Sequence, residues 1–182
     1  MTYPRLLVTI IGIAILGGAI FVLMGGYNVA ATKSHTELTR WLLYTAMQRS
    51  VSLRAISINA PAQFTPEQVK DGFSEFSEMC VTCHGAPGKE RGEIGKGLNP
   101  PPPDLARVAS TWSSAEVFWI VKNGIKMTGM PAFGPTHSDA RLWSIVAFVK
   151  QLQQMTPEDY DKMESAPHQP HEHPPDEHEH EH

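Results

Sequence analysis

The stretch Cys80-Val81-Thr82-Cys83-His84 decides how the rest of this 182-residue sequence is interpreted. Two thiols separated by two residues, with an imidazole directly after the second, have the spacing that attaches a haem covalently. A helix places residues i and i+3 on one face, so both sulfurs can reach the vinyl groups of one porphyrin. His84 can then bind the iron as its proximal ligand. The sequence contains no other cysteine, so it predicts one covalent haem c and leaves no thiol for a structural disulfide.

Three other interpretations of this stretch compete with haem attachment. A thioredoxin-like redox pair requires a strand-helix-strand setting, whereas the upstream residues 72–79 have the composition of a helix. A structural zinc site needs four ligands, and no second Cys-x-x-Cys or suitably spaced histidine pair occurs in the region expected to fold. Chance is the third interpretation, because any five-residue pattern can arise without function.

A second candidate ligand lies in the segment Lys126-Met127-Thr128-Gly129-Met130-Pro131. A six-coordinate haem needs a ligand opposite the histidine, and a methionine thioether is a common one that raises the reduction potential. Gly129 permits unusual backbone angles and Pro131 fixes them, so Met130 is the predicted sixth ligand. Met127, His137 and an open sixth position remain as alternatives.

Helix signals surround these ligands. Capping patterns and apolar periodicity predict helices over residues 65–80, 113–124 and 138–152. Gly72 lies inside the first and costs about 1 kcal/mol relative to alanine, so a neighbour must approach it closely. The last predicted helix is the expected neighbour, with Phe148 at the contact.

The region between the first two helices lacks a periodic pattern. Five glycines fall within residues 85–97, which predicts a loop that wraps an object, and the haem edge is the expected object. The following run, Asn99-Pro100-Pro101-Pro102-Pro103-Asp104, predicts an extended polyproline II segment. That segment either forms a rigid wall of the haem pocket or offers a docking peptide to an aromatic groove.

The N-terminal region predicts a membrane connection. Residues 6–24 carry no charge and would form a helix of about 28 Å, close to the hydrocarbon thickness of a bilayer. A cleaved signal peptide is the alternative, with Val29-Ala30-Ala31 as a cleavage site. The interpretation as an uncleaved, single-pass anchor follows from the length of the apolar run.

A further helix is predicted over residues 33–60, where Leu43, Met47, Val51 and Ala55 recur every fourth position. The first 60 residues contain five basic side chains and one acidic one. This helix either lies in an anionic headgroup layer or packs on the domain or a partner subunit.

The C-terminal residues 157–182 are acidic and then of low complexity, which predicts a disordered tail. Its six histidines are candidates for weak capture of copper, zinc or nickel, with a passive, solvated tail as the alternative: His168, His171, His173, His178, His180 and His182. The mild net charge of −4 argues against nucleic acid as a partner. Four parts are thus expected: 1–31 (anchor), 32–61 (amphipathic helix), 62–156 (haem domain) and 157–182 (tail).

Taken together, Gly72-x-x-x-Phe76-x-x-x-Cys80-x-x-Cys83-His84, Gly129-Met130-Pro131-Ala132-Phe133 and Ile145-Val146-Ala147-Phe148 resemble a class I monohaem cytochrome c. Within that class, the sequence is similar to the cytochrome subunits of bacterial membrane oxidases and dehydrogenases. The resemblance spans roughly residues 64–155. It implies an all-α fold in which small helices cross around one covalent haem, here with an added N-terminal transmembrane helix.

The resemblance also implies site residues and a function. Cys80 and Cys83 would form the thioethers, and His84 and Met130 would bind the iron. The protein would be an electron carrier rather than an enzyme, either a free shuttle or a subunit of an oxidoreductase complex. It would sit in the bacterial cytoplasmic membrane with its haem domain facing the periplasm.

The implied partners are redox proteins, namely a membrane dehydrogenase, an oxidase or another cytochrome, with no small-molecule substrate. Five cations in loops near the expected haem edge are candidates for docking them: Lys89, Arg91, Lys96, Lys122 and Lys126. Two other functions compete with this one. They are a peroxidase-like haem enzyme with an open sixth site and a metal-handling protein that uses the histidine tail.

Overall fold

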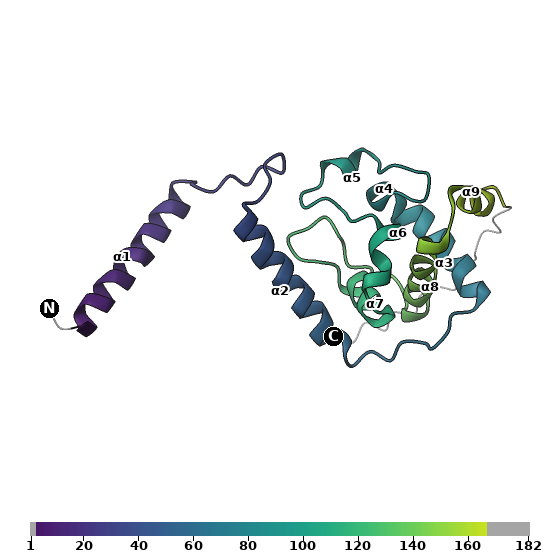
Figure 1. The fold of residues 1–182 in the computed structure, drawn as a ribbon, viewed down its shortest axis with the longest axis horizontal. Helices are drawn as coiled ribbons and strands as arrows, with labels where there is room; N and C mark the ends of the chain where they lie inside the picture. The colour runs from purple at the N-terminus through teal and green to yellow at the C-terminus, as the bar shows by residue number, and fades with distance from the viewer. Residues whose placement is uncertain (1–2, 167–182) are drawn as a thin grey trace. The chain divides into compact units, whose positions relative to one another are not determined.

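A computed structural model describes residues 3–166, which form helices joined by loops and no strand (Figure 1). The all-α expectation is therefore confirmed. The chain divides after Ser34 into two compact units. The first contains α1 (Tyr3–Leu23). The longer helices of the second are α2 (Glu37–Ala55), α3 (Pro66–Met79), α7 (Ser114–Asn123), α8 (Asp139–Gln151) and α9 (Pro157–Ser165), and the short ones are α4 (Val81–His84), α5 (Glu93–Gly97) and α6 (Leu105–Val108).

The helix α1 buries none of its residues in the structure. Its mean hydropathy reaches 2.8, and it is long and apolar enough to cross a membrane. A signal sequence near the N-terminus can pass the same test of length and composition, so both interpretations of this segment agree with the structure.

The centre of the second unit is the crossing of α3 and α8. At Gly72, an added Cβ would lie 1.9 Å from the carbonyl oxygen of Ser144 and 2.9 Å from the Cβ of Phe148. The glycine therefore lets the two backbones touch, as expected. Around the contact, the rings of Phe73 and Phe76 lie 5.4 and 5.1 Å from that of Phe148, in edge or tilted arrangements that aromatic pairs favour.

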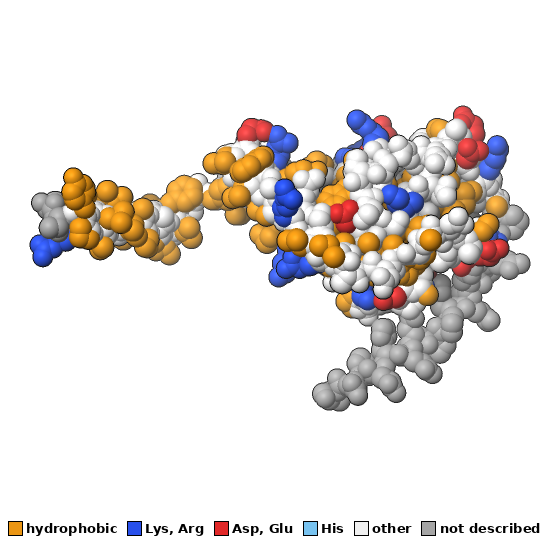
Figure 2. Space-filling model, turned by 60° about the horizontal axis from the view of Figure 1, so that its bottom comes forward, with side chains coloured by type: hydrophobic (Ala, Val, Ile, Leu, Met, Phe, Trp, Pro, Cys, Tyr) orange, Lys and Arg blue, Asp and Glu red, His pale blue; other side chains and the backbone are white. Residues whose placement is uncertain are grey.

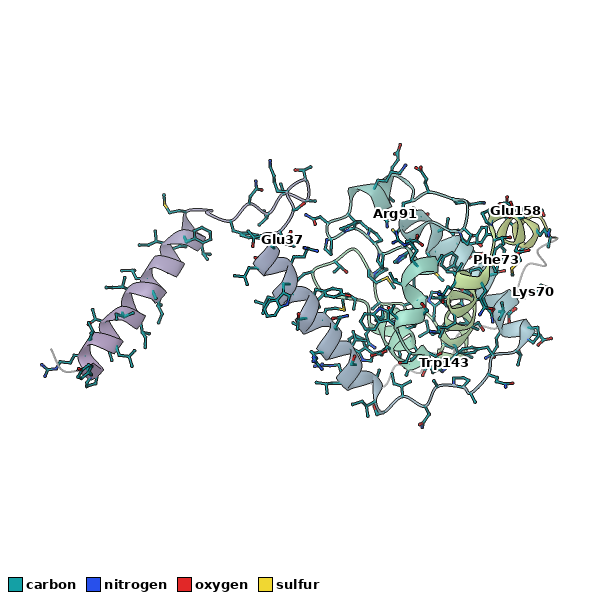
Figure 3. The ribbon with its side chains drawn as sticks, viewed as in Figure 1. Glu37, Lys70, Phe73, Arg91, Trp143 and Glu158 are labelled. Carbon is teal, nitrogen blue, oxygen red and sulfur yellow. The ribbon has the colours of Figure 1, made fainter. Side chains whose placement is uncertain are left out.

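The helix α7 completes the core from the other side of α8. Ser113 caps it, and its hydroxyl accepts from the backbone of Glu116, whose carboxylate in turn accepts from the backbone of Ser113. This reciprocal pair satisfies two of the donors that a helix start leaves open. The ring of Phe118 on α7 stacks on that of Trp143 on α8, with 4.1 Å between the ring centroids. Figure 3 labels Trp143.

The prediction of a disordered tail is wrong over its first nine residues, 157–165, which form α9. Thr156 and Asp159 build a capping box, and Tyr160 is completely buried against Phe73. Tyr160, the partly buried Met163 and the pairing of Lys89 with Glu164 all tie this short acidic helix to the rest of the unit, contacts that composition alone does not predict. Residues 157–165 therefore pack with α3 in the second compact unit.

The helix α2 also belongs to the second unit rather than to a separate linker. It is shorter than the expected 33–60 and packs on α7. Val51 and Ala55 are buried, while Leu43 is half exposed. The Ser52 hydroxyl donates to a carboxylate oxygen of Glu116 at 2.6 Å, which ties α2 to the first turn of α7.

Candidate haem site

The Cys-x-x-Cys-His stretch continues the line of α3 after a slight break. Cys80 ends α3, and α4 begins directly after it. The carbonyl of Cys80 accepts from the backbone N–H groups of Cys83 at 3.1 Å and His84 at 2.8 Å. The two cysteines are thus one helical turn apart, as expected, and Gly85, with φ of +72°, ends the helix.

The chemistry of Cys80 argues against a redox pair. Burial and the nearby Cys83 raise the pKa of the Cys80 thiol to about 12. Thiol–disulfide exchange needs a thiolate, which such a thiol does not supply near neutral pH. Over residues 3–166, no three His, Cys, Asp or Glu side chains gather in a way that could hold zinc.

His84 is oriented by the polyproline segment. Its Nδ1 lies 2.9 Å from the backbone carbonyl oxygen of Pro103. A carbonyl only accepts, so Nδ1 carries the proton and the lone pair of Nε2 is left for a metal. Metal-binding histidines commonly have such a partner on the second nitrogen. Burial lowers the pKa of His84, which favours the neutral imidazole that ligation requires.

The segment after α5 thus acts as the wall of the site, which was one of the two roles expected for it. The glycine-rich residues 85–97, which precede the polyproline segment, pack against α4. At Gly95 a Cβ would lie 2.6 Å from the carbonyl oxygen of Cys83, and the N–H of Gly92 donates to the carbonyl of Thr82 at 2.9 Å. A small pocket opens beside His84 and is lined in part by Arg91, which lies between α4 and α5 (Figure 3).

Met130 lies in a loop that is held at both ends. Its N–H donates to the hydroxyl of Thr128 at 3.1 Å, and its carbonyl accepts from Ile125 at 3.2 Å. On the far side, the N–H of Phe133 donates to the carbonyl of Val121 at the end of α7. The side chain of Met130 is partly buried against the same apolar core that contains Cys80.

The two alternative sixth ligands are placed differently. Met127 is 92% exposed and has φ of +61°. The Nδ1 of His137 lies 2.8 Å from the Thr136 hydroxyl, and its Nε2 lies 3.7 Å from a carboxylate oxygen of Glu75. Both ring nitrogens of His137 therefore face polar groups of the protein rather than an apolar pocket.

The residues present fit a c-type haem. Two thiols stand one turn apart, an imidazole offers one nitrogen with the other hydrogen-bonded, and a thioether lies in a clamped loop beside the same core. These are the attachment and ligand groups that such a haem uses.

The candidate docking cations are partly neutralised. Lys89 pairs with Glu164, Lys96 with Glu90 at 2.8 Å, and Lys122 with Asp139 at 2.6 Å. Within residues 3–166, Arg91 and Lys126 form no ion pair, so they carry the uncompensated positive charge of this set.

Three contacts in and around the site were not anticipated from the sequence. Glu75 is buried and accepts two hydrogen bonds from Arg141, at 2.8 and 3.0 Å. The Nζ of Lys150 donates to two backbone carbonyls of the segment before α7. The third is the carbonyl of Pro103 beside His84, a backbone group that no residue type reveals in a sequence.

The six tail histidines, His168, His171, His173, His178, His180 and His182, lie outside the described residues. Weak metal capture by the tail stays a prediction.

The all-α fold and the Cys-x-x-Cys-His stretch, on a chain with an apolar N-terminal helix, agree with the expected class I cytochrome c. Residues 67–149 match the family model described as cytochrome C oxidase, cbb3-type, subunit III. A search among curated proteins found no match to this chain. The matched segment runs from the first turn of α3 to near the end of α8, and so contains both expected iron ligands.

Proposed function

We propose that this protein carries single electrons through one covalently attached haem whose iron is bound by His84 and Met130. The observation that carries the proposal is the pairing of His84 Nδ1 with the Pro103 carbonyl, directly beside Cys80 and Cys83. A histidine held in this way presents Nε2 as a ligand. Without a ligand, the Nε2 of a partly buried histidine would still need a polar partner. The haem, when bound, supplies the one-electron ferrous–ferric couple.

The cysteines hold the group in place. Each thiol adds across one vinyl double bond, so that a carbon–sulfur bond forms and the thiol hydrogen ends on the neighbouring carbon. This addition needs no oxidant, because the thiol and the vinyl group together lose no electrons. Two thiols one helical turn apart would hold the group at two points on the α3–α4 segment.

The axial residues tune the reduction potential. A thioether ligand raises the potential, while the hydrogen bond from Nδ1 to Pro103 strengthens the imidazole as a donor. With both axial positions filled, no substrate needs to bind the iron. The chain's remaining contribution is to bury the site and to present one edge to a partner.

Partner docking would use the uncompensated cations of the rim. Arg91 and Lys126 are the strongest candidates, because the other three cations are paired within the chain. Weak, charge-steered association suits a carrier that must release its partner after each electron. A membrane dehydrogenase, an oxidase or another cytochrome would be such a partner.

Membrane attachment through α1 would keep the carrier close to these partners. Confinement to a surface raises the effective concentration without new contacts. We infer a bacterial cytoplasmic membrane with the haem domain on the periplasmic side, where haem is attached to such proteins in this family.

Two measurements on the full chain, purified in detergent, test the proposal. After denaturation in SDS, the haem absorbance is expected to stay on the polypeptide and to be lost from the Cys80→Ala/Cys83→Ala variant. Haem that can be extracted from the wild type by acidified organic solvent would refute covalent attachment.

The second measurement concerns the sixth ligand. The ferric protein is expected to show the far-red sulfur-to-iron absorption band, which Met130→Ala abolishes and the matched control Met127→Ala keeps. Met127 suits this control because its side chain is almost fully exposed. A wild type without the band that binds cyanide or peroxide rapidly would instead support a haem enzyme with an open sixth site.

A further inference from the structure

The helix α2 has apolar side chains on two sides, and only one of these sides is covered by the protein. Val51 and Ala55 point to α7 and are 1% and 5% exposed. Together with the hydrogen bond from Ser52 to Glu116, they fix the last two turns of α2 to the cytochrome domain. The helix is therefore a rigid part of the domain, not a flexible tether.

The uncovered side carries large apolar residues. Leu38, Leu42, Leu53 and Ile56 are 72%, 57%, 67% and 78% exposed. At 100° per residue these four positions lie within one sector of the helix, roughly opposite Val51 and Ala55. Figure 2 shows hydrophobic side chains with Lys and Arg among them in the region of α2. Exposed apolar surface of this extent marks a contact site.

Aromatic and basic side chains are also exposed on α2, most of them outside this sector. Trp41 and Tyr44 are 63% and 53% exposed in the first two turns. The helix carries three arginines, Arg40, Arg49 and Arg54, against one acid, Glu37, which is paired with Arg40 at the start of the helix (Figure 3). Arg49 falls in the same sector as Leu42, where a long side chain can bury its stem and extend its charge to the headgroups.

The covalent chain limits how far α2 can be from a bilayer. Residues 24–36 connect it to α1 and reach at most about 45 Å when fully extended. Any bilayer crossed by α1 is thus always within reach of α2. An exposed face of leucine and isoleucine with one arginine among them, on a helix with a net positive charge, has the composition of helices that lie in the headgroup layer of anionic membranes.

We propose that the face of α2 formed by Leu38, Leu42, Leu53 and Ile56 lies in the headgroup layer of an anionic bilayer. The inference rests on the membrane anchor proposed above and not on the haem. Because α2 is fixed to α7, this contact holds the whole cytochrome domain at one orientation on the membrane. The haem edge then faces membrane-bound partners consistently, instead of turning freely on a loop.

The test uses the full chain with its haem, reconstituted into vesicles of phosphatidylcholine with or without phosphatidylglycerol. A nitroxide label is attached at Leu42→Cys, and a matched label at Asp161→Cys on α9, which is exposed and packs on α3 through Tyr160. Both positions are exposed, so neither substitution disturbs the core. Power-saturation EPR then compares collisions with oxygen, which enters the bilayer, and with a water-soluble nickel chelate.

The label at position 42 is expected to favour oxygen over nickel by several-fold in the anionic vesicles, and the label at 161 to favour nickel. Equal nickel access at both positions would overturn the proposal. A position-42 label shielded from both relaxers would place a protein on this face and would also overturn it. If the unmutated protein takes up the label, Cys80 or Cys83 is free, which counts against haem attachment. The α2 comparison can still be made, because the signal of the labelled unmutated protein can be subtracted from the signals of the two variants.

Discussion

The contact at Gly72 allows the free energy of unfolding to be predicted for one substitution. In Gly72→Ala, the new Cβ would meet the Ser144 carbonyl oxygen at 1.9 Å, and real Cβ contacts essentially never fall below 3.0 Å. The backbones of α3 and α8 must therefore separate locally by at least about 1.1 Å. Overpacking of this kind costs about 1–3 kcal/mol, and the obstacle is backbone, which gives less than a side chain. The cost should therefore be near the upper end of this range, and the better helix propensity of alanine offsets about 1 kcal/mol of it, so we expect a net loss of about 2 kcal/mol.

Urea unfolding of the detergent-solubilised full chain, followed by far-UV circular dichroism, measures this loss. Thermal unfolding should show a midpoint lowered by about 2–4 °C per kcal/mol. The matched control is Gly97→Ala, because a Cβ at Gly97 meets nothing within 4 Å. Its free energy of unfolding should stay within about 0.5 kcal/mol of the wild type. Equal stability of both variants and the wild type would refute the close contact between α3 and α8.

Three further substitutions test other contacts. Ser52→Ala removes the hydrogen bond that is the main cause of the lowered pKa of Glu116. The stabilisation from that carboxylate is present above its unfolded pKa of 4.5 and is lost as the pH falls through the lower folded value. The variant should therefore be less stable than the wild type by under about 1 kcal/mol at pH 7, and this difference should disappear in acid. A gap that does not change between pH 7 and pH 3 in urea titrations would contradict this origin. Lys150→Met leaves the carbonyls of Ala109 and Trp112 without the ammonium donor and should cost about 1–3 kcal/mol in the same titrations, whereas a neutral result would show that water replaces the ammonium. Tyr160→Ala should lose about 3–5 kcal/mol and make α9 exchange its amide hydrogens quickly, and protection equal to the wild type would show that α9 is held by other contacts.

Local signals in the sequence were sufficient for the helices that carry caps and a buried stripe. Thr65 and Ser113 begin α3 and α7 with the expected capping boxes. The stripe of α8 is buried as predicted, and Gly72 marks its contact with α3. Such features depend on neighbours within four residues, or on one missing side chain, and both are visible in a sequence.

Contacts between distant polar groups could not be predicted in the same way. The pairing of Glu75 with Arg141 joins two helices 66 positions apart, and each residue alone looks like part of a solvated surface. The role of Pro103 depends on a carbonyl, which every residue has, so no residue type announces it. The haem motif located the site, whereas the partners that orient it come from tertiary structure.

The helix α2 shows why a periodic pattern can give an incomplete answer. Its stripe of Met47, Val51 and Ala55 is real, and its last two members are buried against α7. Once one apolar face is assigned, the remaining apolar residues of a helix are easily taken as a broadening of that face. The structure separates them, because a residue such as Leu42 remains exposed when the domain is fully folded. An apolar surface that the fold leaves uncovered needs another contact, and a nearby bilayer provides one without any partner protein.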